Sequence, residues 1–201
     1  MKLKTAFIVM FVFLIAFMMC TKVEQQQPAD RTLRSGVPFD HQILEDTDAR
    51  HPFVVDVNKD GQNDVIIITN YGGANSYDSK TDKVLSWYEA PEWIRHDVLT
   101  LNYSSCGMAI GDVDGDGDID VIGRDIEPGA EDASGWTIWI ENPLPDGNPA
   151  TGPWNRHPIG QGEYPKEIQV ADFNNDGALD VTGRSHDKLF VWMQTNADEW
   201  A

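Results

Sequence analysis

Three short segments of the chain place oxygen-bearing side chains at alternate positions, a spacing typical of calcium chemistry. They read DVNKDGQND from Asp56, DVDGDGDID from Asp112 and DFNNDGALD from Asp172. Each follows the pattern D-x-[DN]-x-D-G-x-x-D, in which side chains 1, 3 and 5 point inward as the chain curls around a cation. Gly at position 6 permits the sharp turn, a backbone carbonyl at position 7 can add a ligand, and the final Asp closes the set.

Hard oxygen donors without histidine or cysteine favour Ca²⁺ over zinc or copper. Carboxylates this close would repel one another, and a divalent cation removes that cost. A solvated acidic turn is the alternative for one such loop, but three in one register favour about three calcium ions. The predicted ligands stand at positions 1, 3, 5, 7 and 9 of each loop: Asp56, Asn58, Asp60, Gln62, Asp64, Asp112, Asp114, Asp116, Asp118, Asp120, Asp172, Asn174, Asp176, Ala178 and Asp180.

Helical calcium loops do not fit these segments. An EF-hand needs a bidentate Glu at position 12, and a dockerin-like loop also has an acidic residue there. Here position 12 is Ile67, Gly123 or Gly183. The runs that follow the loops, such as DVIII and DVTGR, have the β-branched character of strands rather than helices.

The elements around the loops also repeat. An apolar stretch precedes each loop, a Val/Ile run follows it, and a Trp-centred segment and a His-containing segment come next. The recurrent residues are Trp87, Trp139 and Trp192, and His41, His96 and His157. The histidines precede the next loop by 15, 16 and 15 residues, which indicates units in one register. Alternation and turn residues between the segments predict four short strands per unit.

Four strands in a unit of roughly 45–60 residues is the pattern of a propeller blade. We therefore expect an all-β, β-propeller-type fold with about three four-stranded blades, at about residues 37–91, 92–153 and 154–201. A closed propeller needs about four to eight blades. A partial or open propeller is expected, a fragment of a larger ring that further blades or another chain would complete.

With these motifs, the chain resembles FG-GAP/VCBS repeat proteins, and the integrin α-subunit propeller uses similar Asp loops. The resemblance covers residues 37–200. It implies that the calcium turn joins the first two strands of each blade. The loop motif is specific to the fold and to calcium but not to a substrate. The chain departs from the family in its blade count and in the missing last fourth strand.

The first 20 residues look like an export signal. Lys2 and Lys4 precede an uncharged apolar run of 14 residues from Ala6 to Met19, which is short for a membrane span and typical of a signal-peptide core. A membrane anchor is the alternative reading. Cys20 follows at once, so a lipoprotein signal with a lipidated Cys20 is a further expectation, although Met19 stands where a small residue is favoured. Residues 21–36 are expected to be a linker, and the protein to be periplasmic, at the cell surface or extracellular.

The charge balance excludes some partners. The chain has 33 acidic and 15 basic side chains, a formal net charge of −18. Nucleic acid and anionic membrane surfaces attract positively charged proteins, so neither is expected to be a partner of this acidic chain. Membrane contact is therefore expected only through an N-terminal lipid.

Candidate catalytic residues are few. Because His41, His96 and His157 recur once in every unit, a structural hydrogen-bonding role is expected for them rather than a catalytic one. The non-repeating His186, with Arg124, Arg184 and Tyr164, could serve acid/base chemistry on an acidic sugar. The sequence has no nucleophile elbow or phosphate loop. We favour a binding or interaction module for a protein or glycan. The alternative is a fragment of a propeller enzyme, such as a polysaccharide lyase or a sugar dehydratase-like protein.

Overall fold

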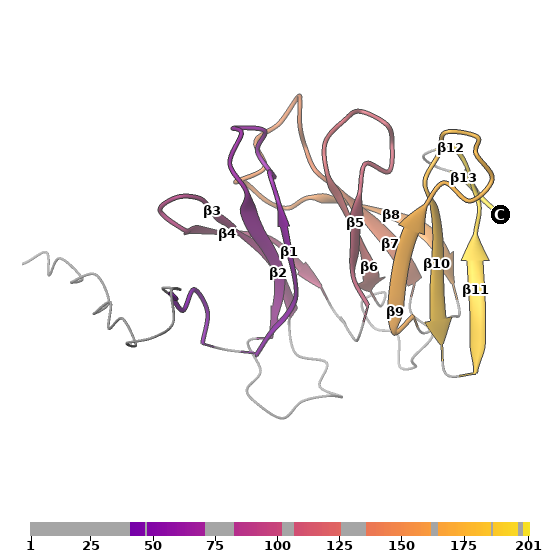
Figure 1. Cartoon of the computed structure of the whole chain (residues 1–201), viewed down its shortest axis with the longest axis horizontal. Coiled ribbons are helices and arrows are strands. Elements are labelled where there is room, and N and C mark those ends of the chain that lie inside the picture. Colours follow the sequence, from indigo (N-terminus) through magenta and orange to yellow (C-terminus); the bar gives the residue numbers. More distant parts are fainter. Residues whose placement is uncertain are drawn as a thin grey trace, which may run out of the picture. The chain divides into compact units, whose positions relative to one another are not determined.

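The computed structural model describes eight stretches: residues 41–46, 48–70, 83–101, 107–125, 136–161, 165–185, 187–196 and 199–201. All regular elements within them are β-strands, which confirms the predicted all-β class (Figure 1). None of the described residues forms a helix long and apolar enough to cross a membrane. The chain divides into a first unit, Met1–Ile43, and a second, Leu44–Ala201, which contains all the strands of the described residues. The expected signal and linker lie outside the described residues.

Two four-stranded antiparallel sheets follow one another along the chain. The first has the order β1-β2-β3-β4 and the second β5-β6-β7-β8, so each is a simple meander. Their strands are β1 (Asp48–Val55), β2 (Asp64–Asn70), β3 (Lys83–Glu89), β4 (Ile94–Leu101), β5 (Ala109–Gly111), β6 (Asp120–Asp125), β7 (Trp136–Glu141) and β8 (Asn155–Gln161). Strands that follow one another in the chain pair as antiparallel neighbours, and β-branched runs such as DVIII form the strands between segments rich in turn residues.

A third sheet has three strands in the order β11-β10-β9, and a short hairpin of two strands follows it. These strands are β9 (Glu167–Ala171), β10 (Asp180–Ser185), β11 (Lys188–Trp192), β12 (Gln194–Asn196) and β13 (Glu199–Trp200). Sheets one and two therefore have the predicted four strands. The third has three among the described residues.

The sheets do not begin where the repeat units were expected to begin. His96 on β4 pairs with Trp87 on β3, and His157 on β8 pairs with Trp139 on β7. Each His-containing strand thus closes its own sheet, so the expected unit boundaries at 91 and 153 fall inside the first and second sheets. Residues 41–46, which include the equivalent His41, contain no strand.

Histidine and tryptophan form the same cluster in two sheets. The His96 ring lies 4.5 Å from the Trp87 ring, and the His157 ring lies 4.1 Å from the Trp139 ring. Each histidine Nε2 is 2.8 Å from a carboxylate of the Trp strand, that of Glu89 or Glu141. A contact that recurs in both four-stranded sheets indicates a role in packing, which agrees with a structural task for His96 and His157.

Trp192 does not occupy the position of the other two tryptophans. Trp87 and Trp139 pair with the residue two places after the closing Asp of their loop. In the third sheet that partner is Thr182, and it pairs with Val191; Trp192 pairs with Val181. The predicted equivalence of Trp192 was therefore wrong by one residue, and because side chains alternate along a strand, its ring lies on the opposite face.

The hydrophobic core lies between successive sheets. One cluster joins the first and second sheets around Trp87 and Ile140, and another joins the second and third around Trp139 and Val181. Two side-chain amides also cross between sheets: Asn142 Nδ2 donates to the carbonyl of Val57 at 3.0 Å, and Gln194 Nε2 donates to that of Val113 at 3.0 Å.

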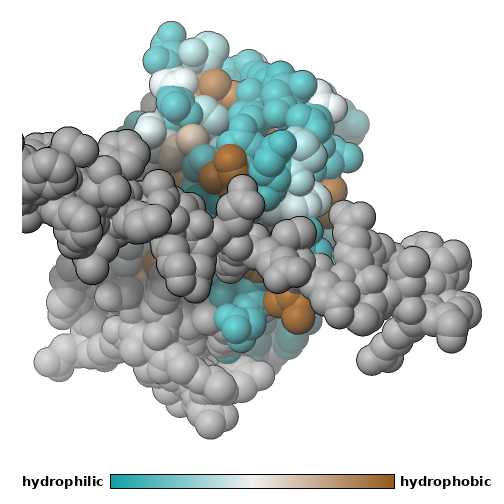
Figure 2. All heavy atoms as spheres, turned by 90° about the vertical axis from the view of Figure 1, so that its left-hand side faces the viewer, coloured by the Kyte–Doolittle hydropathy of each residue, from teal (hydrophilic) through white to brown (hydrophobic). Residues whose placement is uncertain are grey.

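One face of the molecule can be compared with the exposed apolar residues. Seen from the left-hand side of Figure 1, it is mostly hydrophilic with separate hydrophobic patches (Figure 2). Large apolar side chains that are more than half exposed include Val54, Ile94 and Leu189. Singly exposed apolar residues of this kind are common on folded proteins and need no functional explanation.

Candidate metal centre

Each acidic loop connects the first two strands of its sheet. The carboxylate at position 1 accepts a hydrogen bond from the backbone N–H of the position-6 glycine, which closes the turn. The three distances are 2.8 Å for Gly61 N to Asp56 Oδ2, 3.1 Å for Gly117 N to Asp112 Oδ2 and 3.0 Å for Gly177 N to Asp172 Oδ2. These glycines have φ angles of 89°, 89° and 95°, a left-handed conformation that glycine adopts at little cost.

The side-chain oxygens at positions 3 and 5 are held in the same way in all three loops. Each accepts a backbone N–H from two residues further on, at 2.8–3.2 Å. This arrangement is the Asx-turn, in which a short side chain bonds to its own backbone. The predicted ligand positions 1, 3 and 5 are therefore brought to one side of each turn.

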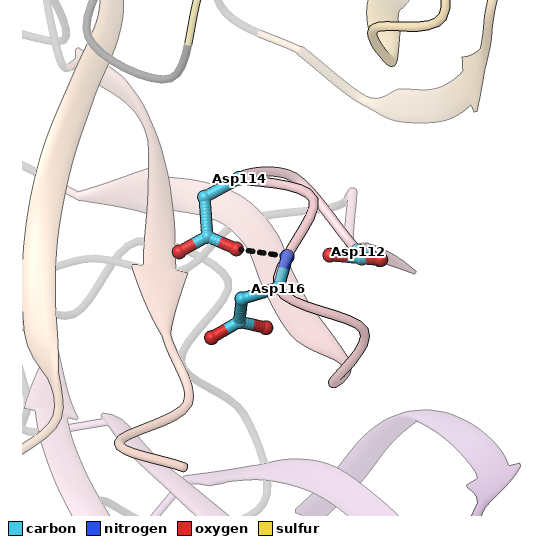
Figure 3. Close-up of side chains that lie close together, drawn as sticks. All are labelled: Asp112, Asp114 and Asp116. Carbon is cyan, nitrogen blue, oxygen red and sulfur yellow. Dashed lines mark hydrogen bonds between the residues drawn. The ribbon is translucent and has the colours of Figure 1, made fainter. Parts of the chain in front are cut away.

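The second loop gathers the most negative charge. One carboxylate oxygen from each of Asp112, Asp114 and Asp116 lies within 4.8 Å of the others. Figure 3 shows these three side chains around the turn, with the hydrogen bond from the Asp116 N–H to Asp114. In the first and third loops an asparagine takes position 3, so an amide oxygen replaces one carboxylate there.

The closing Asp of each loop ties the loop to the end of the third strand. Asp64, Asp120 and Asp180 are fully buried. One oxygen of each accepts the N–H of the position-2 residue, and the other accepts the N–H of a residue just after the Trp strand. The donors are Val57 and Ala90, Val113 and Asn142, and Phe173 and Gln194, at 2.8–3.0 Å.

These bonds give the closing Asp a task that sequence reasoning missed, because nothing in the motif indicates which distant N–H it would reach. An ionised carboxylate offers about four acceptor sites, so two backbone bonds remain compatible with a cation contact. The predicted ligand at position 9 therefore has a structural role within its own sheet, where its hydrogen bonds join the loop to the end of the third strand; below we call this pair of bonds the staple.

Electrostatics single out position 7 of the second loop. Burial, with the neighbouring charge of Asp116, raises the pKa of Asp118 to about 7, against a smaller opposing effect of Lys59. Burial also raises the pKa of Asp120 to about 8, with Asp114 and Asp118 contributing. Carboxylates whose ionised form is this costly favour a compensating cation.

The donor set fits calcium. The predicted ligands are carboxylate, amide and carbonyl oxygens without nitrogen or sulfur, the chemistry that Ca²⁺ prefers. Both carboxylate oxygens of Asp118 are buried without a hydrogen-bond partner among the described residues. Buried carboxylate oxygens without a donor, beside a turn of clustered carboxylates, are compatible in charge with a nearby cation.

The catalytic candidates do not gain support from geometry. Arg124 on β6 is buried, whereas Arg184 on β10 is exposed and its Nε lies 3.1 Å from Glu167. The two side chains therefore occupy different environments, although they hold the same position in equivalent strands, next to the last residue of each. His186 and Tyr164 lie outside the described residues.

The family comparison agrees with this geometry. A family described as FG-GAP-like repeat matches residues 56–123, which run from the start of the first loop through the second loop into β6. The chain contains an FG-GAP-like repeat. This match confirms the resemblance over that segment. Since the FG-GAP-like repeat is a propeller repeat, it agrees with the sheets described above and suggests an interaction module. None of the curated proteins matches the chain.

Proposed function

We propose that the protein is an exported calcium-binding module of β-propeller type that recognises a protein or a glycan, with calcium in a structural role in each sheet. The observation that carries this proposal is the same oxygen cradle in three loops. In all of them the position-1 carboxylate and the oxygens at positions 3 and 5 are oriented by equivalent backbone N–H donors.

A cation in such a loop would stabilise more than the turn. The loop joins strands one and two, and its closing Asp bonds to the residue after strand three. The ligands would then link three strands of one sheet. This placement favours a structural calcium rather than one that contacts a substrate.

Recognition is supported more than catalysis. The FG-GAP-like repeat suggests an interaction module, and the two described catalytic candidates, Arg124 and Arg184, do not share an environment. Export rests on the N-terminal segment 1–20 with its apolar core. Lipidation at Cys20 would anchor the protein to a membrane surface.

Thermal unfolding of the full chain in calcium and in EDTA tests the proposal. One site with free calcium at 100 times its Kd adds about 2.7 kcal/mol to the free energy of unfolding. For a chain of this size each kcal/mol raises the melting temperature by about 2–4 °C, so calcium is expected to raise the melting temperature by roughly 5–10 °C relative to EDTA. Magnesium at the same concentration is the control for general ionic effects. Identical melting curves in calcium and in EDTA would refute the calcium proposal. A separate experiment, binding of the protein to a glycan panel in the presence of calcium, tests whether a glycan is the partner.

A further inference from the structure

The third strand of the first two sheets ends on a glutamate beside the acidic loop. These residues are Glu89 on β3 and Glu141 on β7, and each directly precedes the residue whose N–H binds the closing Asp. The third sheet has Met193 at this position. Its loop nevertheless forms the same cradle, in which Asn174 Oδ1 accepts the Asp176 N–H at 2.9 Å. The fold of the loop therefore does not require the glutamate.

Glu89 connects the first loop to the histidine and tryptophan of its sheet. Its Oε1 accepts a hydrogen bond from Asn58 Nδ2 at 3.2 Å, and its Oε2 lies 2.8 Å from His96 Nε2. The His96 ring packs against Trp87, which is 1% exposed. Each oxygen of the carboxylate thus has its own partner, and a buried side chain fixes the far end of this series of contacts.

The partner of Glu89 in the loop is a predicted ligand whose two ends differ. To bind a cation, the Asn58 amide must present its oxygen and not its nitrogen. On the loop side Asn58 Oδ1 accepts the Asp60 N–H at 3.0 Å, while Nδ2 faces Glu89. An ionised carboxylate accepts hydrogen bonds and donates none, so the reversed amide would place two acceptor oxygens against each other. Glu89 therefore selects the orientation that keeps the amide oxygen in the loop.

The other two loops do not use a glutamate in this way. Position 3 of the second loop is Asp114, whose two carboxylate oxygens are alike and need no such selection. Glu141 acts on Asp114 as a like charge. In the third loop Asn174 Nδ2 donates to Asp176 Oδ2 at 2.7 Å, a bond within the loop itself. The corresponding bond in the first loop is longer, at 3.4 Å, and the bond to the glutamate is present in addition.

We infer that Glu89 is a positioning residue of the first loop, which holds the Asn58 amide so that its oxygen faces the cation. The inference rests on the proposed calcium binding, and it adds a residue that lies outside the loop motif. Hydrogen-bond partners of metal ligands fix the orientation of the ligands, and their loss lowers metal affinity about 10–100-fold. The low end of this range is expected here, because the Glu89 side chain is 32% exposed.

The test isolates the first loop in the full chain. Asp116→Ala with Asp176→Ala removes a predicted ligand from each of the other two loops. Calcium is titrated by calorimetry into this background, alone and with Glu89→Ala or Glu89→Gln. Alanine removes the acceptor, whereas glutamine keeps an oxygen for Asn58 and an NH₂ group that can donate to His96. Both variants lose the negative charge, so the difference between them measures orientation and not charge.

Glu89→Ala is expected to weaken calcium binding about tenfold, which corresponds to about 1.4 kcal/mol, and Glu89→Gln less than about threefold. Glu141 provides the matched control, in a background of Asp60→Ala with Asp176→Ala that leaves the second loop intact. Glu141→Ala and Glu141→Gln should change the calcium affinity of that loop equally, because Asp114 has no amide to orient.

A double-mutant cycle separates positioning from a general structural effect. Asn58→Ala in the first-loop background removes the amide that Glu89 orients. In its presence Glu89→Ala should weaken calcium binding no more than Glu89→Gln does. Melting in EDTA measures the structural part separately: losing the contact between Glu89 and His96 should lower the melting temperature of Glu89→Ala to the same extent with and without Asn58→Ala.

Three results would overturn the inference and leave the proposed function intact. They are an unchanged calcium affinity in Glu89→Ala, an equal loss in Glu89→Ala and Glu89→Gln, and a tenfold loss that persists when Asn58 is replaced by alanine. In each of them the parent background still binds calcium. If no background binds calcium, the proposed function is refuted and the inference with it.

Discussion

The closing Asp of the first loop offers a test of the staple that is independent of calcium. Asp64→Ala removes the acceptor of two backbone N–H groups, those of Val57 at 3.0 Å and of Ala90 at 2.9 Å. Both donors are buried. In the variant they would remain in the protein interior without water or another acceptor to replace the carboxylate.

The magnitude follows from the number of donors. A buried donor left unsatisfied costs about 1–3 kcal/mol, so two of them cost about 2–6 kcal/mol. Part of this is offset, because burial raises the pKa of Asp64 and its removal relieves the cost of burying a carboxylate. We expect a net loss of about 2–4 kcal/mol, a large share of the roughly 5–15 kcal/mol that stabilises a domain.

Urea unfolding in EDTA, followed by tryptophan fluorescence, measures this loss without any contribution from bound calcium. The matched control is Asp60→Ala in the same loop, since Asp60 is exposed and accepts no bond from a buried donor: its donors are the Gln62 backbone N–H at 2.8 Å and the side-chain amides of Asn58 and Gln62 at 3.4 Å, all in exposed contacts. The control should unfold near the wild-type urea concentration. If Asp64→Ala and Asp60→Ala lower the urea midpoint of unfolding equally, the two backbone bonds of the closing Asp do not stabilise the sheet.

Two further predictions concern pH and backbone strain. In the calcium-free protein the pKa of Asp118 is about 7 and that of Asp120 about 8, both above the value of about 3.9 in an unfolded chain. The folded state then binds more protons between these values, so its stability should fall as pH rises from about 4 to 8; a rise over that range in EDTA would contradict the assignment. Gly61→Ala, at φ 89°, should cost about 1–2 kcal/mol, whereas Gly123→Ala, with no atom within 4 Å of the new Cβ, should be close to neutral by thermal melting.

Much of the fold could be predicted from sequence because its signals are local. The alternation of DVIII and similar runs, the Gly and Asn of the turns, and the recurrence of the Asp loops predict the meander of strands. The cradle at positions 1, 3 and 5 could be predicted for the same reason: the bonds that shape it join residues two to five apart.

The features that sequence reasoning missed depend on contacts between distant residues. The register of the third sheet is one: the separation between the loop and the Trp strand varies from unit to unit, so counting could not show that Val191, and not Trp192, matches Trp87. The burial of Asp118 is another, because position 7 is variable in the motif and its exposure depends on neighbouring elements.

The two amide bonds between sheets have a direction. The backbone of the first loop is held at Val57 by Asn142 of the second sheet, and that of the second loop at Val113 by Gln194, just beyond the third. The first and second loops are therefore each held by an amide from a segment further along the chain, Asn142 and Gln194 respectively. Together with the hydrophobic clusters between successive sheets, these amides couple neighbouring sheets, so the array is expected to unfold as a chain of nearest neighbours with a direction rather than as a set of independent blades.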